Sequence, residues 1–355
     1  MGDVVLAGSF PNLLDSYLYG TQATVRAPII FFTFPEFANL LNANPYIAKI
    51  VVIPRFRGLL GIIKFIKHLK SQLVINECDV IFDLQSSLRT RVASCFFSFP
   101  IFVYPKGRWK RFLFMLGFKT LGEAPISQVK RYEKFLKYIF FATNQWNWSV
   151  PRVSRLDVEE SIKKKKQQGP LTFAPILKKS VELPAKFVVF LPSAAHQKKR
   201  WPEIYFLKLS SLVFQNTKEK YKIIVLAGAK DDFCAIFDQV PGVINLAGKT
   251  NIEESSEILS HASLVVGNDT GLMHIAEALR RPYLTIFGPT SEYFGFIPHT
   301  TYGQTISLSL WCRPCSATGS GICYRSDKKC LVNISPDSVW EKIKLYLLDD
   351  EELKT

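Results

Sequence analysis

Short runs of β-branched and aromatic residues alternate with helix-patterned segments along this chain, and this alternation restricts the fold more than any other feature. Strands separated by helices cannot pair as hairpins, so they assemble into parallel sheets covered by helices. The pattern therefore predicts an α/β protein. In the first half, it predicts strands at residues 27–34, 50–53 and 79–84 and helices at 59–73 and 129–141.

The alternation stops between residues 144 and 186, where Pro, Ser and charged residues dominate, and then begins again. The second half has predicted strands at 187–191, 222–227, 243–246, 264–267 and 283–287 and predicted helices at 203–214, 252–260, 272–279 and 336–348. We therefore predict an N-terminal domain over 1–150, a linker over 151–186, a C-terminal domain over 187–335 and a C-terminal helix over 336–355. A chain of 355 residues is long enough for two such cores.

The chain carries 45 Lys and Arg against 30 Asp and Glu, which gives a formal charge of +15. An anionic partner is therefore plausible: nucleic acid, a phosphorylated substrate or an anionic membrane surface. The sequence contains no helix-turn-helix, RNP-like or zinc-finger pattern, which argues against nucleic acid. The run that comes nearest to a membrane span, the uncharged segment 92–104, is interrupted by Pro100 and is too short to span a bilayer. These features predict a soluble cytoplasmic protein.

The most informative stretch begins with the predicted strand 264–267, which is followed by Asn268, Asp269, Thr270 and Gly271 and then by a helix. The N–H groups at the start of a helix bind anions, so a phosphate could dock on Thr270 and Gly271. Alternatively, Asp269 or Thr270 serves only as the N-cap. His274 lies one turn further on the same helix face, where it is either a structural residue or part of this anion site.

A second anion-binding pattern follows the predicted strand 187–191. Residues 192–202 (PSAAHQKKRWP) combine small residues, three consecutive cations and a proline that starts the next helix. The segment is either a phosphate site or a basic surface loop. Trp201 is expected to anchor it by packing into the core.

Four cysteines, Cys312, Cys315, Cys323 and Cys330, lie close together near the end of the chain. Their spacing is compatible with a structural zinc or other metal site but lacks the second CxxC of a typical zinc motif. The alternatives are reduced thiols or a labile disulfide, and neither reading gives the cysteines a catalytic role.

Several of these stretches together resemble glycosyltransferase family 9, the ADP-heptose:lipopolysaccharide heptosyltransferases, across almost the whole chain. The resemblance rests on GDVVL at 2–6, CDVIFDLQSSLRT at 78–90, PSAAHQKKRWP at 192–202, NLAGKTNIEESSEILSHASLVVGNDTGLMHIAEALRRP at 245–282 and FGPT at 287–290. It implies a GT-B fold, in which two Rossmann-like, doubly wound domains face a cleft. The C-terminal domain would bind the donor nucleotide, the N-terminal domain would bind the acceptor, and catalysis would be inverting without a metal ion or other cofactor.

The resemblance also implies roles for individual residues. The donor's diphosphate and heptose would be held by Asp269, Thr270 and Gly271, with His274 adjacent. Lys199 matches the lysine on the donor phosphates, and Asp232 falls where the family often has a Glu for the ribose. Asp3 matches the carboxylate proposed to deprotonate the acceptor hydroxyl. Ala194 and Ala195 stand where hydroxyl residues are common in the family, so one donor contact differs.

The function implied is transfer of heptose from ADP-heptose to the lipid A–core acceptor of lipopolysaccharide, at the cytoplasmic face of the inner membrane. The basic run 106–111 would contact the anionic membrane surface as a peripheral attachment, or it is simply a solvated face. The alternatives are a related GT-B transferase that uses another nucleotide sugar and a non-catalytic protein of the same fold.

In the family, a first strand of about ten residues precedes the Gly-Asp turn, whereas here Gly2 and Asp3 directly follow Met1. We therefore expect the first, central strand of the N-terminal sheet to be missing and the natural reading frame to start upstream. A gap in that sheet would follow, since a central parallel strand pairs on both sides.

Overall fold

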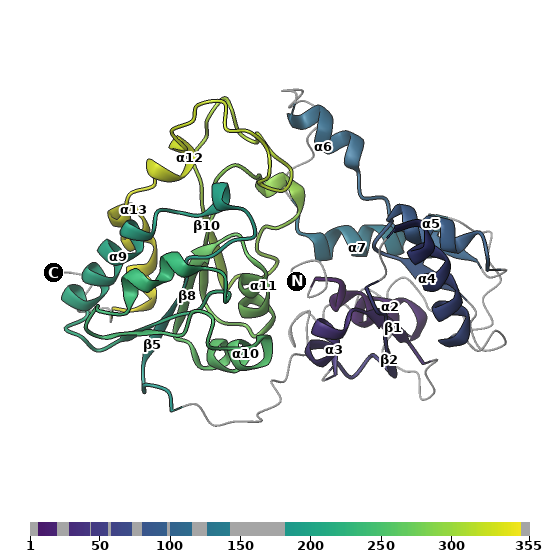
Figure 1. The fold of residues 1–355 in the computed structure, drawn as a ribbon, viewed down its shortest axis with the longest axis horizontal. Helices are drawn as coiled ribbons and strands as arrows, with labels where there is room; N and C mark the ends of the chain where they lie inside the picture. Colours follow the sequence, from purple (N-terminus) through teal and green to yellow (C-terminus); the bar gives the residue numbers. More distant parts are fainter. Residues whose placement is uncertain are drawn as a thin grey trace. The chain divides into compact units, whose positions relative to one another are not determined.

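We describe the protein from a computed structural model, which covers residues 6–19, 28–42, 44–55, 58–72, 80–97, 100–115, 126–142 and 182–348 (Figure 1). The chain divides into two compact units. The C-terminal unit contains Leu6 and the described residues within 110–131 and 182–348, and the N-terminal unit contains those within 7–109 and 132–142. Residues 151–181 of the predicted linker lie outside the described residues, and the predicted domain boundaries stay predictions.

The C-terminal unit is built on a six-stranded parallel sheet. Its strands are β5 (Phe187–Leu191), β6 (Lys222–Val225), β7 (Val243–Asn245), β8 (Leu264–Asn268), β9 (Tyr283–Ile286) and β10 (Gly303–Ile306). Their order across the sheet is β7-β6-β5-β8-β9-β10. In chain order this is the 3-2-1-4-5-6 arrangement of dinucleotide-binding folds. The predicted Rossmann-like architecture of this part of the chain is therefore confirmed, although the sequence analysis missed β10.

Helices connect these strands close to the predicted positions. The α-helices are α9 (Glu203–Asn216), α10 (Ile252–His261), α11 (Gly271–Ala278), α12 (Lys329–Val332) and α13 (Pro336–Ile343). Short 3₁₀ turns are η3 (Gln197–Lys199), η4 (Asp232–Phe237), η5 (Glu292–Phe294) and η6 (Lys344–Tyr346). Local sequence explains where two of the helices start. Asn251 and Glu254 form a reciprocal capping box at α10, and Ser335 caps α13, which has Pro336 in its first turn.

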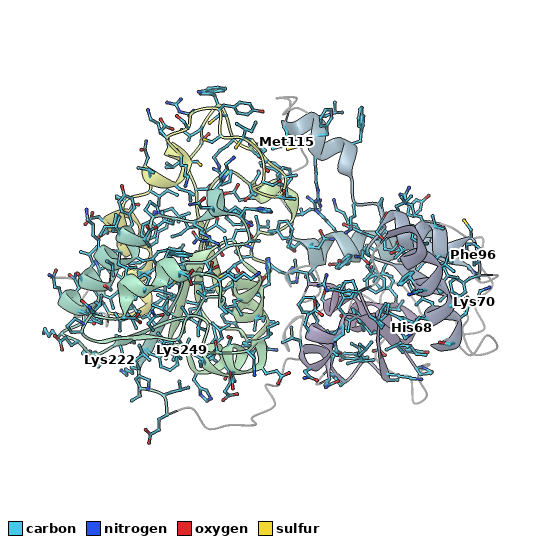
Figure 2. All side chains as sticks on the ribbon, in the orientation of Figure 1. His68, Lys70, Phe96, Met115, Lys222 and Lys249 are labelled. Carbon is cyan, nitrogen blue, oxygen red and sulfur yellow. The ribbon has the colours of Figure 1, made fainter. Side chains whose placement is uncertain are left out.

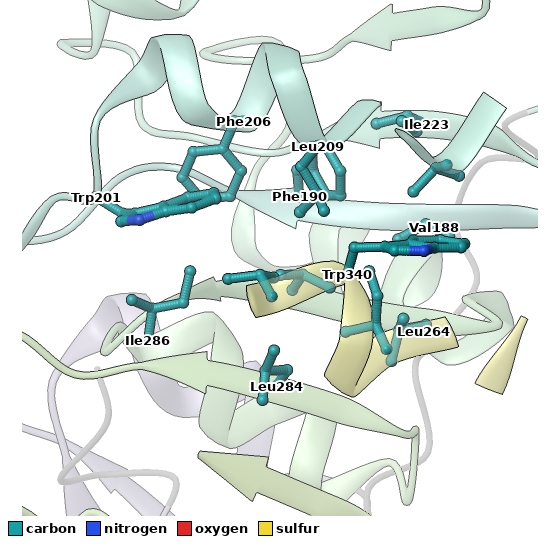
Figure 3. Packing of buried hydrophobic residues seen from close by; sticks show 14 of the residues in the cluster. Val188, Phe190, Trp201, Phe206, Leu209, Ile223, Leu264, Leu284, Ile286 and Trp340 are labelled. Atoms are coloured by element: carbon teal, nitrogen blue, oxygen red, sulfur yellow. The ribbon is translucent and has the colours of Figure 1, made fainter. Parts of the chain in front are cut away.

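The core of the C-terminal unit lies between the sheet and its helices (Figure 3). Phe190 and Ile223 of the strands, Phe206 and Leu209 of α9, and Trp340 of α13 contribute apolar side chains to this cluster. Burying one such side chain stabilises the folded state by roughly 1.5–3 kcal/mol. Trp201 is 1% exposed, and its indole N–H donates to the carbonyl of Ile334 at 2.8 Å. The expectation that Trp201 is a packing anchor is confirmed, so the basic segment before it is held at a fixed place on the core.

The N-terminal unit also alternates helices with parallel strands. Its strands are β1 (Ile30–Thr33), β2 (Lys49–Val52), β3 (Ile81–Asp83) and β4 (Ile101–Val103). Its helices are α2 (Ser9–Tyr19), α3 (Pro35–Leu41), α4 (Gly58–Gln72), α5 (Leu88–Ser94) and the π-helix η2 (Tyr138–Ala142), while α6 (Arg108–Met115) and α7 (Gln128–Lys137) contribute residues to both units. Strand β4 was not predicted, because Pro100 directly before it breaks the pattern of a strand.

The four described strands of the N-terminal unit form two separate pairs, β1 with β2 and β3 with β4. Residues 1–5, on which the expected gap in the N-terminal sheet depends, lie outside the described residues, so that expectation stays a prediction. Helix α4 packs beside the first pair, and Nε2 of His68 lies 3.0 Å from the carbonyl oxygen of Val52. On the same helix, Lys70 lies over the ring of Phe96 at 5.8 Å (Figure 2). No helix among the described residues is long and apolar enough to cross a bilayer.

Candidate active site

The strands β5 and β8 are neighbours in the C-terminal sheet, and they flank the point where the strand order reverses. The next strand along the chain from β5 is β6 on one side, and the next from β8 is β9 on the other side. Ligands of open α/β sheets bind beyond the carboxyl ends of the strands at such a switch point. The segments that leave β5 and β8 here are 192–202 and 269–271, the same two segments that the sequence identifies as anion-binding patterns.

Asn268 joins these two segments at their bases. Its side chain is fully buried, its Nδ2 donates to the carbonyl of Pro192 at 2.7 Å, and its Oδ1 accepts from the N–H of Trp201 at 2.8 Å. Gly267 is paired with Leu191 in the sheet, and a Cβ at this glycine would lie 2.6 Å from the Leu191 carbonyl oxygen. The close approach of the two strands and the amide bridge together fix the relative position of the two loops.

Lys199 and Asp269 form an ion pair between these loops. Nζ of Lys199 lies 2.5 Å from Oδ2 of Asp269, and the two side chains are 12% and 7% exposed. The same carboxylate oxygen accepts a hydrogen bond from the Thr290 hydroxyl at 3.3 Å. Thr290 belongs to the segment that follows β9, so residues after three adjacent strands meet at one carboxylate. The site thus places a nearly buried cation at the end of the sheet.

Helix α11 begins beside this ion pair. Thr270 occupies the N-cap position with an extended backbone, but its side chain makes no capping hydrogen bond. Gly271 is the first helical residue, so no bulky side chain covers the start of the helix. The first N–H groups of a helix carry a partial positive charge. Lys199 and the start of α11 therefore present positive charge from two neighbouring elements.

His274 lies inside α11 and is 7% exposed. Its ring centroid lies 5.7 Å from that of Phe296, with the two rings tilted by 42°. The imidazole is therefore packed against an aromatic side chain within the C-terminal unit. Its predicted place next to the donor stays a prediction.

Asp231, which the sequence analysis did not single out, organises the other side of the loop after β5. Its Oδ2 accepts from the Ser193 hydroxyl at 2.5 Å and from the N–H of Gly228 at 2.9 Å, and its Oδ1 pairs with Nη2 of Arg200 at 2.9 Å. The predicted ribose ligand, Asp232, is the exposed neighbour that begins η4. The turn directs the Asp231 carboxylate toward the loop after β5 and leaves Asp232 exposed. No local sequence signal marks Asp231, because its carboxylate accepts from an N–H three residues earlier, whereas the side chain of an Asx turn accepts from the residue two positions later.

Arg200 is also fixed by contacts other than its ion pair. Its guanidinium donates from Nε and Nη2 to the carbonyl of Ala194 at 3.2 and 3.1 Å, and it lies 4.6 Å from the centre of the Phe233 ring. Of the three consecutive cations, Arg200 therefore supports the loop structurally. Lys199 is the one directed at Asp269.

The four cysteines near the end of the chain are all described, and none of them is in a disulfide. Among the residues that the structure describes, no group of three or more His, Cys, Asp or Glu side chains is arranged to hold a metal ion. Burial raises the pKa of Cys315, and the neighbouring thiols of Cys323 and Cys312 raise it further. Burial raises the pKa of Cys330 to about 11, against the opposing effect of Arg313. Both cysteines are thus thiols at neutral pH in this structure.

The predicted base, Asp3, lies outside the described residues. The described parts of the two units therefore contain the predicted donor residues but not the predicted acid–base residue.

The fold and this site together define a class of protein. A Rossmann-like sheet with an ion-paired lysine and a free helix start at its switch point, joined to a second α/β unit, fits the GT-B architecture of nucleotide-sugar-dependent glycosyltransferases. The structure of E. coli ADP-heptose lps heptosyltransferase II has the same fold, with a TM-score of 0.64 and 23% identity over 99% of this chain and 96% of that chain. The family model for glycosyltransferase family 9 (heptosyltransferase) matches residues 66–322. The chain belongs to this family.

Individual relatives agree with this assignment. Lipooligosaccharide heptosyltransferase 2 of Haemophilus influenzae is 36% identical over 103 residues, which are 27% of this chain and 29% of the relative. Lipooligosaccharide heptosyltransferase 2 of Haemophilus ducreyi is 25% identical over 366 residues, which are 98% of this chain and 97% of the relative. The more identical match thus spans less than a third of the relative's length.

Proposed function

We propose that this protein transfers heptose from ADP-heptose to the lipid A–core acceptor of lipopolysaccharide, with inversion at the anomeric carbon. The observation that carries the proposal is the Lys199–Asp269 ion pair beside the start of α11, at the switch point of a Rossmann-like sheet. The names of the relatives, all heptosyltransferases, support heptose as the sugar and ADP as the nucleotide.

The positive charge at the site suits a diphosphate leaving group. As the bond between the anomeric carbon and the diphosphate breaks, negative charge grows on the ADP oxygens. Lys199 and the first N–H groups of α11 stabilise this charge, with Thr270 and Gly271 against the phosphates. These groups supply the positive charge that the departing ADP needs, so the proposal includes no metal ion. Asp232, exposed at the start of η4, would accept hydrogen bonds from the ribose hydroxyls.

Asp269 has a different role in this scheme. Its carboxylate holds Lys199 in place before the donor arrives, since Nζ lies 2.5 Å from Oδ2. When the diphosphate binds, the ammonium is shared between the carboxylate and a phosphate oxygen. The freed acceptor oxygens of Asp269 then bind hydroxyl groups of the heptose. His274, in the first turns of the same helix, is proposed to lie at the edge of this sugar site.

The acceptor hydroxyl must lose its proton as it attacks the anomeric carbon. We assign this step to the Asp3 carboxylate, on the resemblance of residues 2–6 to the family. The proton passes from the hydroxyl to the carboxylate, the hydroxyl oxygen bonds to the anomeric carbon, and ADP leaves from the opposite face. Asp3→Asn should therefore lower kcat strongly while ADP affinity stays the same.

We propose a cavity in the N-terminal unit as the binding site of the acceptor. It has a volume of about 390 Å³ and lies where the chain leaves β3 and β4, lined by Ser86, Leu88, Arg91, Pro105, Lys106 and Gly107. Two of the lining residues are cations and none is acidic. Phosphate and sugar carboxylate groups of a lipid A–core acceptor match this charge. We propose that the basic run 106–111, with Trp109 70% exposed, extends the contact to an anionic membrane surface and attaches the enzyme peripherally at the cytoplasmic face.

One assay tests the proposal. The purified protein is incubated with ADP-heptose and a Kdo–lipid A acceptor, and ADP release is followed. Release that needs both substrates supports the proposal, and a panel of truncated core acceptors identifies the hydroxyl that is used. Release only with another nucleotide sugar would identify a different GT-B transferase. No release with any donor, from a folded protein that binds no ADP, would identify a non-catalytic protein of this fold.

A further inference from the structure

The segment 312–321, which contains two of the four cysteines, packs directly against Lys198 and Lys199. Nζ of Lys198 donates to the carbonyl of Gly321 at 2.6 Å. Gly319 lies so close to Lys199 that a Cβ on this glycine would be 2.5 Å from Cδ of the lysine. Gly319 also has a φ of +89°, a conformation that favours glycine. The absence of a side chain at Gly319 therefore leaves room for the lysine stem.

Ser316 holds this segment in shape. Its side chain is 6% exposed, and its hydroxyl oxygen accepts from the N–H groups of Gly319 at 2.8 Å, Gly321 at 3.2 Å and Thr318 at 3.3 Å. Two of these three peptides belong to the glycines that contact Lys198 and Lys199. The buried Ser316 hydroxyl thus fixes the position of the backbone that contacts Lys198 and Lys199.

The start of the same segment is tied to the other member of the ion pair. Arg313 donates from Nε to the carbonyl of Gly288 at 2.6 Å and from Nη2 to that of Thr290 at 3.0 Å. The N–H of Cys315 donates to the carbonyl of Pro289 at 3.1 Å. Thr290 in turn donates its hydroxyl to Asp269. The segment 312–321 therefore contacts Lys199 on one side and the residue that supports Asp269 on the other.

We infer that the segment 312–321 is a positioning element of the donor site, and that Ser316 is a positioning residue that acts on the diphosphate through Lys199. A free lysine side chain loses much conformational freedom when it is ordered. Here the stem is already confined by Gly319, so less entropy is lost when the ammonium binds a phosphate. This inference rests on the proposed function, because it takes the ligand of Lys199 to be the donor diphosphate.

A double-mutant cycle tests the inference with ADP as the probe. Isothermal titration calorimetry gives the ADP dissociation constant for the wild type, Ser316→Ala, Lys199→Ala and the double variant. We expect Ser316→Ala to weaken ADP binding by roughly 2- to 150-fold, the range of coupling between residues that share one site. In the Lys199→Ala background, the same change should have no further effect. The matched control is Ser320→Ala, because Ser320 is an exposed serine of the same segment whose hydroxyl lies 2.8 Å from that of Thr318.

The cycle separates the possible failures. If Ser316→Ala weakens ADP binding equally with and without Lys199, Ser316 has a general structural role and the inference is wrong. If Lys199→Ala weakens ADP binding but Ser316→Ala does not, the inference is wrong while the proposed donor site stands. If Lys199→Ala leaves ADP affinity unchanged, both the inference and the proposed donor site are wrong.

A second variant keeps the inference testable if Ser316→Ala does not fold. Gly319→Ala adds a methyl group against the Lys199 stem, so it should weaken ADP binding in the wild-type background and much less in Lys199→Ala, where the stem is gone. Gly242→Ala is the matched control, since Gly242 also has positive φ, +80°, and its added Cβ would lie 3.0 Å from the Phe214 ring, before β7 and away from the donor residues. Equal effects of Gly319→Ala in both lysine backgrounds would overturn the inference. Ser316→Thr, which keeps the hydroxyl, should bind ADP with an affinity close to that of the wild type.

Discussion

Lys199 and Asp269 are paired at 2.5 Å with both side chains nearly buried, although they belong to loops that follow different strands. The pair joins the loop after β5 to the start of α11, so it has a structural role before any ligand arrives. A buried ion pair is expensive to break from one side, because the remaining charge is left without its partner. Substitutions at the two residues should therefore affect stability and binding differently.

The first prediction concerns the cation. Lys199→Ala should weaken ADP binding by about 10- to 150-fold, the equivalent of a lost charge-assisted hydrogen bond of roughly 1.5–3 kcal/mol. It should also lower the free energy of unfolding, because Asp269 is 7% exposed and loses its counter-charge. Calorimetry with ADP and urea unfolding measure the two effects. An unchanged ADP affinity would remove Lys199 from the donor site.

The second prediction concerns the carboxylate. Asp269→Asn keeps the size of the side chain and an oxygen for the Thr290 hydroxyl, but removes the negative charge beside the diphosphate. We expect turnover of ADP-heptose to fall while ADP binding is retained or becomes tighter, since Lys199 is released for the phosphates. Steady-state kinetics and ADP titration test this, with thermal melting as the check on folding. Full turnover in a folded Asp269→Asn protein would contradict the proposed sugar contact.

The third prediction concerns Asn268, whose side-chain amide joins the two loops at the switch point. Asn268→Ala removes the hydrogen bonds to Pro192 and Trp201 and leaves two buried backbone groups unpaired. Each such group costs about 1–3 kcal/mol, so we expect a loss of roughly 2–6 kcal/mol in the free energy of unfolding. Asn216→Ala is the matched control, because the Asn216 side chain makes one exposed hydrogen bond at the end of α9. Similar stabilities of the two variants would show that the bridge is not important.

The fourth prediction concerns thiol reactivity. Burial raises the pKa of Cys234 to about 12 and that of Cys330 to about 11. A raised pKa means a smaller thiolate fraction at pH 8, and only the thiolate reacts with iodoacetamide. Peptide mapping after labelling at pH 8 should therefore find Cys95, which is exposed, modified well before Cys234 and Cys330. Labelling of the two buried thiols should speed up as pH rises toward 11. Early labelling of Cys330 at pH 8 would contradict its burial.

The fifth prediction concerns attachment to membranes. If the basic run 106–111 contacts anionic lipid, binding to vesicles that contain phosphatidylglycerol should weaken steeply as salt rises from 0.01 to 0.1 M, because the Debye length falls from about 30 to about 10 Å. Co-sedimentation over this salt range measures the effect, and neutral vesicles are the control. Salt-insensitive binding would indicate hydrophobic insertion instead of electrostatic attachment.

The α/β class, most of the strands and the two segments that form the candidate site could be predicted from local patterns in the amino-acid sequence. Predicted strands 187–191 and 264–267 became β5 (Phe187–Leu191) and β8 (Leu264–Asn268), and the predicted helix 203–214 became α9 (Glu203–Asn216). These features follow from local patterns of burial and backbone preference, which neighbouring residues express on their own. The family resemblance added the assignment of Lys199, and the family match of residues 66–322 confirmed the family.

Which of these residues contact one another depends on the order of the strands and on packing. The strand order puts β5 beside β8, and this places Lys199 against Asp269 and Asn268 between their loops. Likewise, it is the turn after β6 that makes Asp231 the inward carboxylate and Asp232 the outward one, and it is the packing of Gly319 that confines Lys199. Such contacts join residues far apart in the chain. They depend on the crossover connections and on close packing of the whole unit, and no local pattern in the sequence encodes either.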